Sequence, residues 1–339
     1  MSQRKEDHIS YALAQPVKHN DFDRFRFVHN SIPSTSLETI DLSTTLGPFT
    51  LKVPFFINAM TGGSEQSFKI NEKLAKLAKA CDLAMATGSV SIALKDPSLS
   101  DSFTILSKVN PEGLRFSNVG AGTNSSKLNQ AVDLVHAQAC QVHLNALQEL
   151  IMPEGDKDFT SWWSDLEECV LNSKVPLIVK EVGFGMGPSL ILKLEKLGVM
   201  MIDVSGRGGT DFAWIENQRR DHSLNFFNDW GLSTLECLLS IQGKTKVDLI
   251  ASGGVRSALD IAKALASGAK AVGLSSYFLK LVTDHSLEEA VKQVEQLKDE
   301  LKLIMCALDA KNIEDLRACE FILDPDLQNR VNQLRTTIR

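Results

Sequence analysis

The 339-residue sequence lacks the signals of several protein classes. Its six cysteines form no C-x-x-C pair, which argues against a zinc site and a disulfide framework and is typical of reduced cytoplasmic thiols. The first 15 residues contain no apolar core of a signal peptide, and no later stretch is apolar enough to span a bilayer. The net charge of −6 argues against a general nucleic-acid binder. We therefore expect a soluble cytoplasmic protein without nucleic-acid or membrane partners.

The chain also lacks a low-complexity linker and any sign of a second domain. After Pro54, short apolar runs that end in small or polar residues alternate with amphipathic stretches at helical spacing. The eight strand candidates lie at 55–60, 83–89, 114–122, 140–145, 176–183, 200–206, 247–255 and 271–276. Each precedes a helix candidate, and eight such units predict an α/β protein with a (β/α)8 TIM barrel.

A doubly wound open sheet is the alternative fold, but it usually has fewer strands. Its nucleotide-binding form carries a glycine fingerprint after the first strand, and the chain reads NAMTGGSEQS at 58–67 instead of G-x-G-x-x-G. Before Pro54, the pattern predicts a hairpin around Gly47 and Pro48 that covers the barrel floor. We expect an arm and hairpin extension over residues 1–54, and a barrel with C-terminal helices over residues 55–339.

Small and hydrogen-bonding side chains dominate the predicted C-terminal ends of the strands, where barrels build their active sites. Strand ends are often polar simply because loops begin there. That explanation does not extend to Lys180 within LIVKEVG, because an isolated buried ammonium group is costly and demands an anionic or electron-rich partner. The collection suits a large, planar, polar ligand across the barrel mouth.

The last two strands predict a phosphate site. ASGGVRS at 251–257 and GLSS at 273–276 each join a strand to a helix start, and barrels often bind phosphate at these two loops. Gly253 and Gly254 would allow a close approach of the backbone to phosphate, although a tight turn alone would also need glycine. In QVHLNALQELIMPEGD at 141–156, an apolar run breaks into an imidazole, His143, two amides, Asn145 and Gln148, and carboxylates.

Motifs that extend over nearly the whole chain carry a resemblance to one known family. They are RKEDHI at 4–9, NAMTGG at 58–63, TGS at 87–89, HLNALQELIMPEGD at 143–156, VKEVGFGMG at 179–187, DVSGRGGTDFAWIE at 203–216, DWGLST at 229–234 and ASGGVRSALDIAKALASGA at 251–269. In this order they resemble type 2 isopentenyl-diphosphate isomerases, flavin-dependent enzymes on a (β/α)8 barrel. Many relatives read GSQR where this chain reads GSVS at 88–91, so it lacks the Gln and Arg side chains there.

The resemblance implies FMN as the cofactor. Lys180 would approach the N1/C2 edge of the flavin and stabilise negative charge on the reduced ring. Gly254, Val255, Arg256, Ser275 and Ser276 would hold the phosphate. The remaining implied contacts to the cofactor are those of Ala59, Met60, Thr61, Ser89, Asn118, Ser205 and Thr210.

The resemblance also implies a diphosphate substrate and a magnesium ion. Glu149 offers the hard oxygen ligand that suits Mg²⁺, which usually takes few protein ligands and completes its shell with phosphate oxygens. His143, Asn145 and Gln148 would hydrogen-bond the diphosphate or lie near the allyl group, as implied catalytic residues. Arg4, Lys5 and His8 would close over the anion together with Gln148. By composition alone, this arm would be a solvated, charged terminus.

The implied activity is the interconversion of isopentenyl and dimethylallyl diphosphate in isoprenoid biosynthesis. One proton is added and another removed, and the alkene is too weak a base for an ordinary side chain. The reduced flavin is implied to act as the acid–base group, with NADPH as its reductant and no net redox change. Gln148 would lie near the second proton, although neutral amides are poor bases. The family also leads us to expect a homo-oligomer, a tetramer or octamer.

Three rival functions are open to a chain of this pattern. A flavin-dependent 2-hydroxy-acid oxidase uses a histidine in an HGGR-like motif, where this chain reads SGRGGT at 205–210. Relatives of inosine monophosphate dehydrogenase need a cysteine after the sixth strand, and residues 206–231 contain none. A flavin-binding carrier or regulator without catalysis would leave Glu149 and the RKEDH arm without a role.

Overall fold

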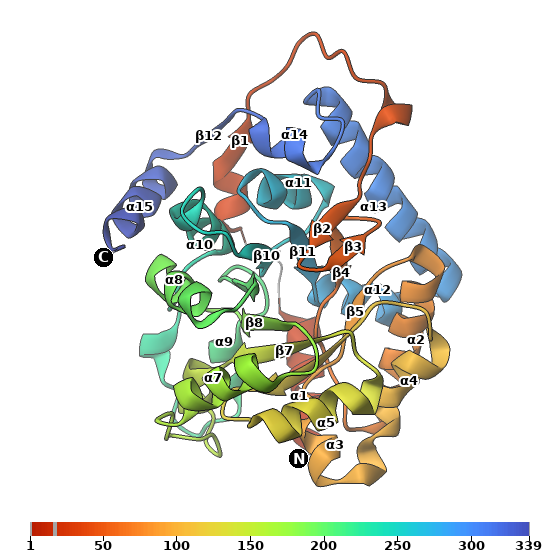
Figure 1. The fold of residues 1–339 in the computed structure, drawn as a ribbon, viewed down its shortest axis with the longest axis vertical. Coiled ribbons are helices and arrows are strands. Elements are labelled where there is room, and N and C mark those ends of the chain that lie inside the picture. Colours follow the sequence, from red (N-terminus) through yellow and green to blue (C-terminus); the bar gives the residue numbers. More distant parts are fainter. Residues whose placement is uncertain (1, 16–18, 339) are drawn as a thin grey trace.

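The computed structural model describes residues 2–15 and 19–338, with only the backbone described for residues 2–7. Eight parallel strands close into a barrel in chain order, and the last strand pairs with the first (Figure 1). They are β4 (Phe55–Ile57), β5 (Met85–Ala86), β6 (Arg115–Gly120), β7 (Ala139–Leu144), β8 (Leu177–Glu181), β9 (Met201–Asp203), β10 (Asp248–Ser252) and β11 (Ala271–Leu274). All eight fall at the segments that the sequence predicts, which confirms the (β/α)8 barrel.

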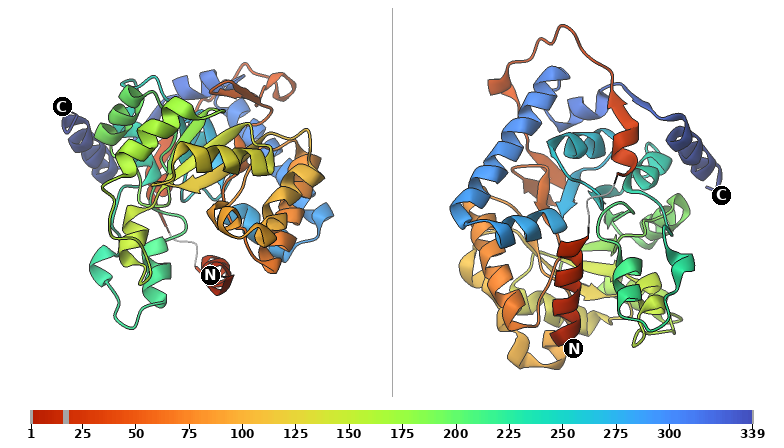
Figure 2. Two further views of the ribbon diagram at one scale, coloured as in Figure 1. Left: turned by 60° about the horizontal axis from the view of Figure 1, so that its bottom comes forward. Right: turned by 180° about the vertical axis from the view of Figure 1, so that it is seen from behind.

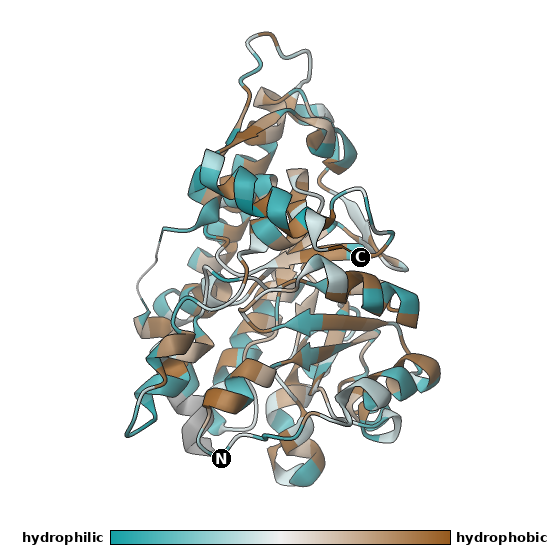
Figure 3. Cartoon of the chain, turned by 90° about the vertical axis from the view of Figure 1, so that its left-hand side faces the viewer, coloured by the Kyte–Doolittle hydropathy of each residue, from teal (hydrophilic) through white to brown (hydrophobic). Residues whose placement is uncertain are grey.

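Helices follow the strands and pack outside the barrel. They are α2 (Glu65–Cys81), α3 (Ser91–Lys95), α4 (Asp101–Val109), α5 (Ser125–Val135), α6 (Ala146–Ile151), α7 (Trp162–Asn172), α8 (Pro188–Leu197), α9 (Phe212–Gln218), α10 (Thr234–Ile241), α11 (Ala258–Ala266) and α12 (Ser276–Asp284), and after the barrel α13 (Leu287–Ala307), α14 (Ile313–Ala318) and α15 (Pro325–Thr336). In Figure 3 the central strands are mostly hydrophobic, whereas the helices carry both colours along their length. Such amphipathic helices bury one face against the sheet and leave the other in water.

The barrel floor is closed by the hairpin of β2 (Thr44–Leu46) and β3 (Phe49–Leu51), which the sequence predicts. Leu46 and Leu51 are buried in one cluster with inward-facing barrel residues such as Phe116 and Met201. The Gly47 N–H donates to the carboxylate of Asp248 at 2.7 Å. A plugged floor leaves the opposite end of the barrel for ligands. The division of the chain at residue 54 into two units stays a prediction.

The two ends of the chain meet outside the barrel. The short strand β1 (Phe25–Phe27) pairs with β12 (Phe321–Leu323) in antiparallel register, and Phe25 stacks on Phe321 with ring centroids 4.4 Å apart. The sequence predicts only helices in the last segment, from about residue 286 to 339, so the strand β12 differs from that prediction. Its three residues are too few to show an alternation, and its pairing partner lies almost 300 residues away.

The loops at the open end contain three further helices that the sequence does not predict, of which α3 has five residues. α6 begins the segment interpreted as a loop after the fourth barrel strand, and α9 lies within the long loop after β9. Both are six or seven residues long, too short for a periodic pattern. The N-terminal arm is also a helix, α1 (Ser2–Ala14). In the right-hand view of Figure 2, α1 (dark red) runs between α12 and α9, both of which it contacts.

Within the described part of the chain, no helix has the length and apolar character needed to cross a bilayer.

Candidate active site

One cavity of about 740 Å³ opens at the C-terminal ends of the barrel strands. It brings together most of the residues that the sequence singles out. Those lining it are His8, Ala59, Met60, Thr61, Ser89, Asn118, His143, Asn145, Gln148, Glu149, Lys180, Ser205, Thr210, Gly254, Val255, Ser275 and Ser276. The cavity therefore joins the expected flavin contacts to the expected substrate contacts in a single space.

The corner of the cavity formed by the last two loops has the features of a phosphate site. Gly253 and Gly254 have φ angles of +93° and +80°, which L-residues rarely adopt, and a Cβ on Gly253 would lie 1.9 Å from the carbonyl oxygen of Gly206. Beside them, α12 starts at Ser276, and the side chain of Ser275 does not cap it. A helix N-terminus with uncapped N–H groups favours an anion. This corner fits the phosphate of a flavin nucleotide.

Arg256 has a different environment from the one expected for a phosphate ligand. Its guanidinium group binds the carboxylates of Asp23 and Asp260, with N–O distances of 2.6 Å and 2.8 Å. Its backbone N–H donates to Asp260 as well. These hydrogen bonds raise the pKa of Arg256, and the side chain is not among the described groups that line the cavity. The phosphate-binding role of Arg256 stays a prediction from the sequence.

Lys180 places an ammonium group at the cavity wall, although only 7% of the residue is exposed. Its Nζ donates to the carbonyl oxygen of Glu181 at 2.6 Å. Burial raises the pKa of Glu181 to about 7, against the opposing effect of three backbone N–H donors in residues 182–184. A cation with so little water around it gains from a ligand that develops negative charge, as a reduced flavin does.

Asp203 is a buried acid beside Lys180 in the barrel wall. β8 and β9 pair Lys180 with Asp203, and Asp203 is fully buried. Burial raises its pKa, while Lys180 and hydrogen bonds from Ser252 and Asn58 act in the opposite direction. The Asp203 carboxylate accepts from Asn58 Nδ2 and Ser252 Oγ, each at 2.7 Å. It therefore anchors side chains from two further strands.

A row of buried amides crosses the barrel from Asn58 to His143. Gln141 Nε2 donates to Asn58 Oδ1, Asn118 Nδ2 donates to Gln141 Oε1, and His143 Nδ1 meets Asn118 Oδ1. Each of the three distances is 2.8 Å. The backbone N–H of Ala59 also donates to Asn58 Oδ1, which fixes the orientation of the first amide.

The direction of this row fixes the proton on His143. Because Asn58 presents its oxygen to Gln141, Gln141 must present its own oxygen to Asn118. Asn118 then turns its oxygen toward His143, so Nδ1 carries the proton of the neutral ring. The Nε2 atom is left unprotonated on an imidazole at the cavity wall. Such a ring can accept a proton or a hydrogen bond from a ligand.

Glu149 lies on α6 with both carboxylate oxygens oriented by neighbours. Asn145 Nδ2 donates to Oε1 at 2.8 Å, and the backbone N–H of Asp156 donates to Oε2 at 2.9 Å. Among residues 2–15 and 19–338, no group of three or more His, Cys, Asp or Glu side chains could hold a metal ion. A magnesium ion at Glu149 would therefore complete its shell with substrate oxygens and water, which is its usual mode with phosphates.

Gln148, also on α6, is held by a residue that the sequence does not single out. Its Nε2 donates to the carboxylate of Glu216 on α9 at 2.9 Å, and His8 Nε2 lies 2.9 Å from the same oxygen. Burial opposes ionisation of Glu216, but hydrogen bonds from His8, Gln148 and Arg219 hold its pKa below the ordinary value. Since Glu216 takes the amide nitrogen, the oxygen of Gln148 is the group left for a ligand.

The helix α1 covers one side of the cavity and binds its own barrel. Besides the contact of His8 with Glu216, Tyr11 packs its ring edge-on against Trp214 with centroids 5.8 Å apart. Gln15 exchanges two hydrogen bonds with the backbone of Asp211. Ile9 is buried and lines the cavity. The side chains of Arg4 and Lys5 lie outside the described residues, so their role stays a prediction.

Sequence reasoning missed three buried polar residues of this site, which are Gln141, Asp203 and Glu216. Gln141 and Asp203 lie inside strand candidates, where an inward-facing polar side chain is the only available signal. Glu216 lies in the DFAWIE motif, next to residues that pack α9, and its partners come from α1 and α6. Only the folded chain brings these partners together.

Comparisons with known proteins agree with this geometry. Residues 110–321 match a protein-family model described as FMN-dependent dehydrogenase. The isopentenyl-diphosphate delta-isomerase of Staphylococcus aureus strain JH9 is 46% identical over 334 residues, covering 98% of this chain and 96% of the relative. The enzyme of the same name from Staphylococcus aureus strain Newman is 45% identical over 339 residues, covering 99% and 97%.

Solved structures show the same fold at lower identity. The recombinant flavin-binding domain of baker's yeast flavocytochrome b2 superposes with a TM-score of 0.70 at 20% identity, covering 96% of this chain and 81% of that one. A mandelate oxidase mutant with benzaldehyde gives a TM-score of 0.66 at 14% identity, with coverages of 95% and 97%. The isomerases share 45–46% identity with this chain over nearly its full length, whereas the oxidase and flavocytochrome structures share only the fold. The chain belongs to the isopentenyl-diphosphate delta-isomerase family, in its FMN-dependent type 2 form.

Proposed function

We propose that this protein interconverts isopentenyl diphosphate and dimethylallyl diphosphate by shifting a double bond, with FMN, NADPH and Mg²⁺. The observation that carries the proposal is the single cavity, which joins a phosphate corner at Gly253 and Gly254 to the cluster of His143, Gln148 and Glu149. A cofactor with a phosphate and a substrate with a diphosphate would occupy its two parts. The relatives of nearly equal length that are named for this reaction support the assignment.

The cofactor half of the cavity is built for a reduced flavin. Gly253 and Gly254, with the N-terminus of α12, would hold the phosphate, and Lys180 would offset negative charge on the ring. When bound and reduced by NADPH, FMN supplies the acid–base chemistry that protonation of a weakly basic alkene demands. Residues 59–61 would line the ring and exclude water from it.

The substrate half supplies the groups that a metal-bound diphosphate requires. Glu149 would give Mg²⁺ one carboxylate oxygen, already oriented by Asn145. Lys95 and Lys127 also line the cavity and add positive charge to it. His8 would complete the wall from α1. These groups reconcile a net charge of −6 with a strongly anionic substrate.

Two side chains are placed to handle the protons of the hydrocarbon part. The oxygen of Gln148 would face the ligand because its Nε2 donates to Glu216. Nε2 of His143 would face the ligand because the Nδ1–H donates to Asn118 Oδ1. An amide is a poor base, so His143 is the better proton acceptor of the pair at neutral pH. Gln148 would orient the substrate for this transfer.

The proposal includes a cytoplasmic location and assembly into a homo-oligomer. All six cysteines are free thiols in the described part of the chain, as expected in the reducing cytoplasm. The family expectation of a homo-oligomer belongs to the proposal as well.

The test compares two reactions on the purified holoprotein. Under anaerobic conditions, NADPH should bleach the flavin absorbance, and added isopentenyl diphosphate with Mg²⁺ should yield dimethylallyl diphosphate. Lactate and mandelate, substrates for a 2-hydroxy-acid oxidase, should leave the oxidised flavin unbleached. Bleaching by either hydroxy acid without isomerase turnover would assign the protein to the rival reaction.

A further inference from the structure

Residues 19–24, which we call the N-terminal brace, lie behind the phosphate corner on the side away from the cavity. Asn20 caps the short 3-10 helix Asp21–Arg24, since its Oδ1 accepts from the Phe22 N–H and Asp23 returns a bond to the Asn20 N–H. A capping box of this kind is self-contained. It leaves the Nδ2 group of Asn20 for contacts outside the brace.

Asn20 Nδ2 connects the two loops that form the phosphate corner. It donates to the carbonyl oxygen of Gly254, after β10, at 2.9 Å, and to that of Gly208, after β9, at 3.3 Å. The contact is close, because a Cβ on Gly254 would lie 2.8 Å from Nδ2, and one on Gly208 would lie 3.1 Å from Asn20 Cβ. One side-chain amide therefore hydrogen-bonds both glycine-rich loops.

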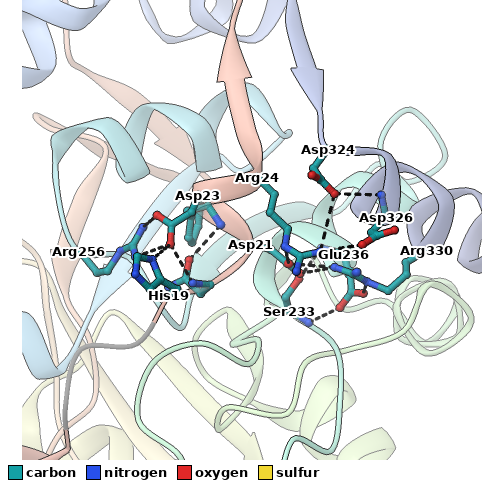
Figure 4. Close-up of polar contacts among 12 residues, drawn as sticks. His19, Asp21, Asp23, Arg24, Ser233, Glu236, Arg256, Asp324, Asp326 and Arg330 are labelled. Carbon is teal, nitrogen blue, oxygen red and sulfur yellow. Dashed lines mark hydrogen bonds and ion pairs between the residues drawn. The ribbon is translucent and has the colours of Figure 1, made fainter.

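Ion pairs fasten the brace to the helix that follows the glycine pair. Asp23 forms two hydrogen bonds with Arg256, at 2.6 Å and 3.1 Å (Figure 4). Arg256 in turn binds the buried Asp260 on α11. Bidentate pairs of this kind add geometric specificity. The buried Lys263 on α11 donates to the Phe22 carbonyl oxygen at 2.7 Å. The Asp23 contacts give Arg256 a role that differs from direct contact with phosphate.

The far side of the brace is held by the C-terminal helix. Arg330 on α15 binds Asp21 through two contacts of 2.9 Å and 3.0 Å, and it also binds Glu236 on α10 (Figure 4). Glu236 closes the N-terminus of α10 through the Ser233 N–H. The brace is thus fixed at both ends, and a fixed brace can impose a position on the loops that it contacts.

We propose that the N-terminal brace positions the cofactor-phosphate turn, and that Asn20 and Asp23 are positioning residues for FMN although neither lines the cavity. The inference rests on the proposed function in one respect, the placing of the FMN phosphate at Gly253 and Gly254. Backbone N–H groups bind phosphate well only when they point at one place. Thr234 Oγ1 donates to the carbonyl oxygens of Ser252 and Gly253, and the Gly206 N–H donates to that of Ser252, so the first part of the turn is held from the barrel side. The brace holds the second glycine, Gly254, through Asn20.

The decisive variant is Asn20→Ser in the full chain. Serine is a good N-cap and carries no charge, so it keeps the brace folded, but it is too short to reach both carbonyl oxygens. The matched control is Asn30→Ser, because Asn30 is half-buried and also accepts from the N–H two residues later, in an exposed hydrogen bond. FMN binding to the apoproteins is measured by quenching of flavin fluorescence, and folding by the melting temperature of each apoprotein.

The expected FMN dissociation constant of Asn20→Ser is at least about fivefold above that of wild type, as the loss of two hydrogen bonds predicts. Asn30→Ser should match wild type, and the apoproteins should melt within a few degrees of one another. Raising the FMN concentration should restore the isomerase turnover of Asn20→Ser, because the substitution lowers cofactor affinity and removes no group that lines the cavity. An unchanged FMN dissociation constant in Asn20→Ser, or an equal rise in Asn30→Ser, would overturn the proposal.

A second pair of variants keeps the test decisive if Asn20→Ser folds poorly. Asp23→Asn removes the charge that holds Arg256, whereas Asp326→Asn removes an exposed charge that pairs with Arg24 in the same cluster. Only Asp23→Asn should weaken FMN binding, and equal affinities for the two variants would contradict the proposal. The FMN affinities are measured without isomerase substrate. A failed isomerase assay would therefore contradict the proposed function and leave this comparison valid.

Discussion

Glu149 is the side chain on which the proposed metal role depends. Glu149→Gln keeps the size of the side chain but exchanges a carboxylate oxygen for a weaker neutral donor. Turnover should fall by about 100-fold or more, the scale on which one electrostatic stabiliser is felt. Excess Mg²⁺ should restore part of the activity, and the FMN dissociation constant should not change. Steady-state assays across a magnesium titration measure the first two effects, and quenching of flavin fluorescence measures the FMN dissociation constant.

The control for this variant is Glu167→Gln, a substitution of the same kind on an exposed position of α7. It should behave like wild type in turnover and in magnesium dependence. If Glu149→Gln also keeps wild-type turnover and magnesium dependence, the carboxylate has only the structural contacts with Asn145 and Asp156. The metal assignment would then be withdrawn.

The amide row makes a separate prediction for His143. Gln141→Met keeps similar length and volume but removes both hydrogen-bonding groups, so Asn118 is free to turn its amide. The ring 15N chemical shifts of His143 should report a single tautomer in the wild type and a mixture of two tautomers in the variant. Turnover should fall by about tenfold, less than the 100-fold or more typical of losing a proton-transfer group. An unchanged tautomer in Gln141→Met would show that the row does not control the ring.

The sequence identifies the residues that line the cavity more readily than the residues that hold them in place. Gly254, Lys180 and Glu149 stand in local patterns that name a chemistry, and the fold places all three around one cavity. Glu216 and Asn20 act through partners that are far away in sequence, so no local pattern reveals them. Arg256 shows the converse, because its place after a glycine pair suggests phosphate while its partner Asp23 comes from another part of the chain.

Among the elements, the barrel strands were predictable because each is an apolar run bounded by turn signals and followed by an amphipathic helix. The short elements were not. α9 is rich in aromatic and apolar residues without a full helical period, and β12 exists only because β1 pairs with it. α1 is charged along much of its length, and it is ordered against the barrel through contacts such as that of Tyr11 with Trp214.

The N-terminal helix carries a prediction about substrate affinity. The double variant Arg4→Ala/Lys5→Ala should raise the KM for isopentenyl diphosphate, because charge-assisted hydrogen bonds to phosphate oxygens are lost. The increase should be about tenfold or more, and bound flavin should remain at the wild-type level. Steady-state kinetics and the flavin absorbance of the purified variant give the two values. Loss of flavin would show that α1 is required for the cofactor instead.

The floor hairpin carries a prediction about stability. Gly47 has a φ of +55°, and a Cβ there would lie 2.7 Å from the sulfur of the buried Met201. Gly243→Ala, at a φ of +76° with open space around it, should cost about 1–2 kcal/mol for backbone strain alone. Gly47→Ala should cost about 1–3 kcal/mol more, because it also overpacks the barrel floor. Equal unfolding free energies in urea for the two variants would contradict the tight fit of the hairpin.

For the molecule as a whole, the two ends of the barrel have separate roles. The floor is closed by packing, and the open end forms the cavity. The hairpin of residues 44–51 fills the bottom, while the chain's N-terminal and C-terminal segments meet at the brace beside the phosphate corner. The cavity between them holds cations and hydrogen-bonding groups in a protein of net charge −6. Local groups, and not the overall field, therefore select the anionic ligands.

The most direct test of the isomerase assignment is a proton NMR spectrum of isopentenyl diphosphate in D2O with catalytic amounts of the NADPH-reduced holoprotein and Mg²⁺. The vinylidene signals should decay as dimethylallyl methyl signals and deuterium incorporation appear, with many turnovers for each NADPH consumed. A spectrum that stays unchanged, or product limited to one equivalent for each NADPH, would contradict a redox-neutral double-bond shift in this cavity.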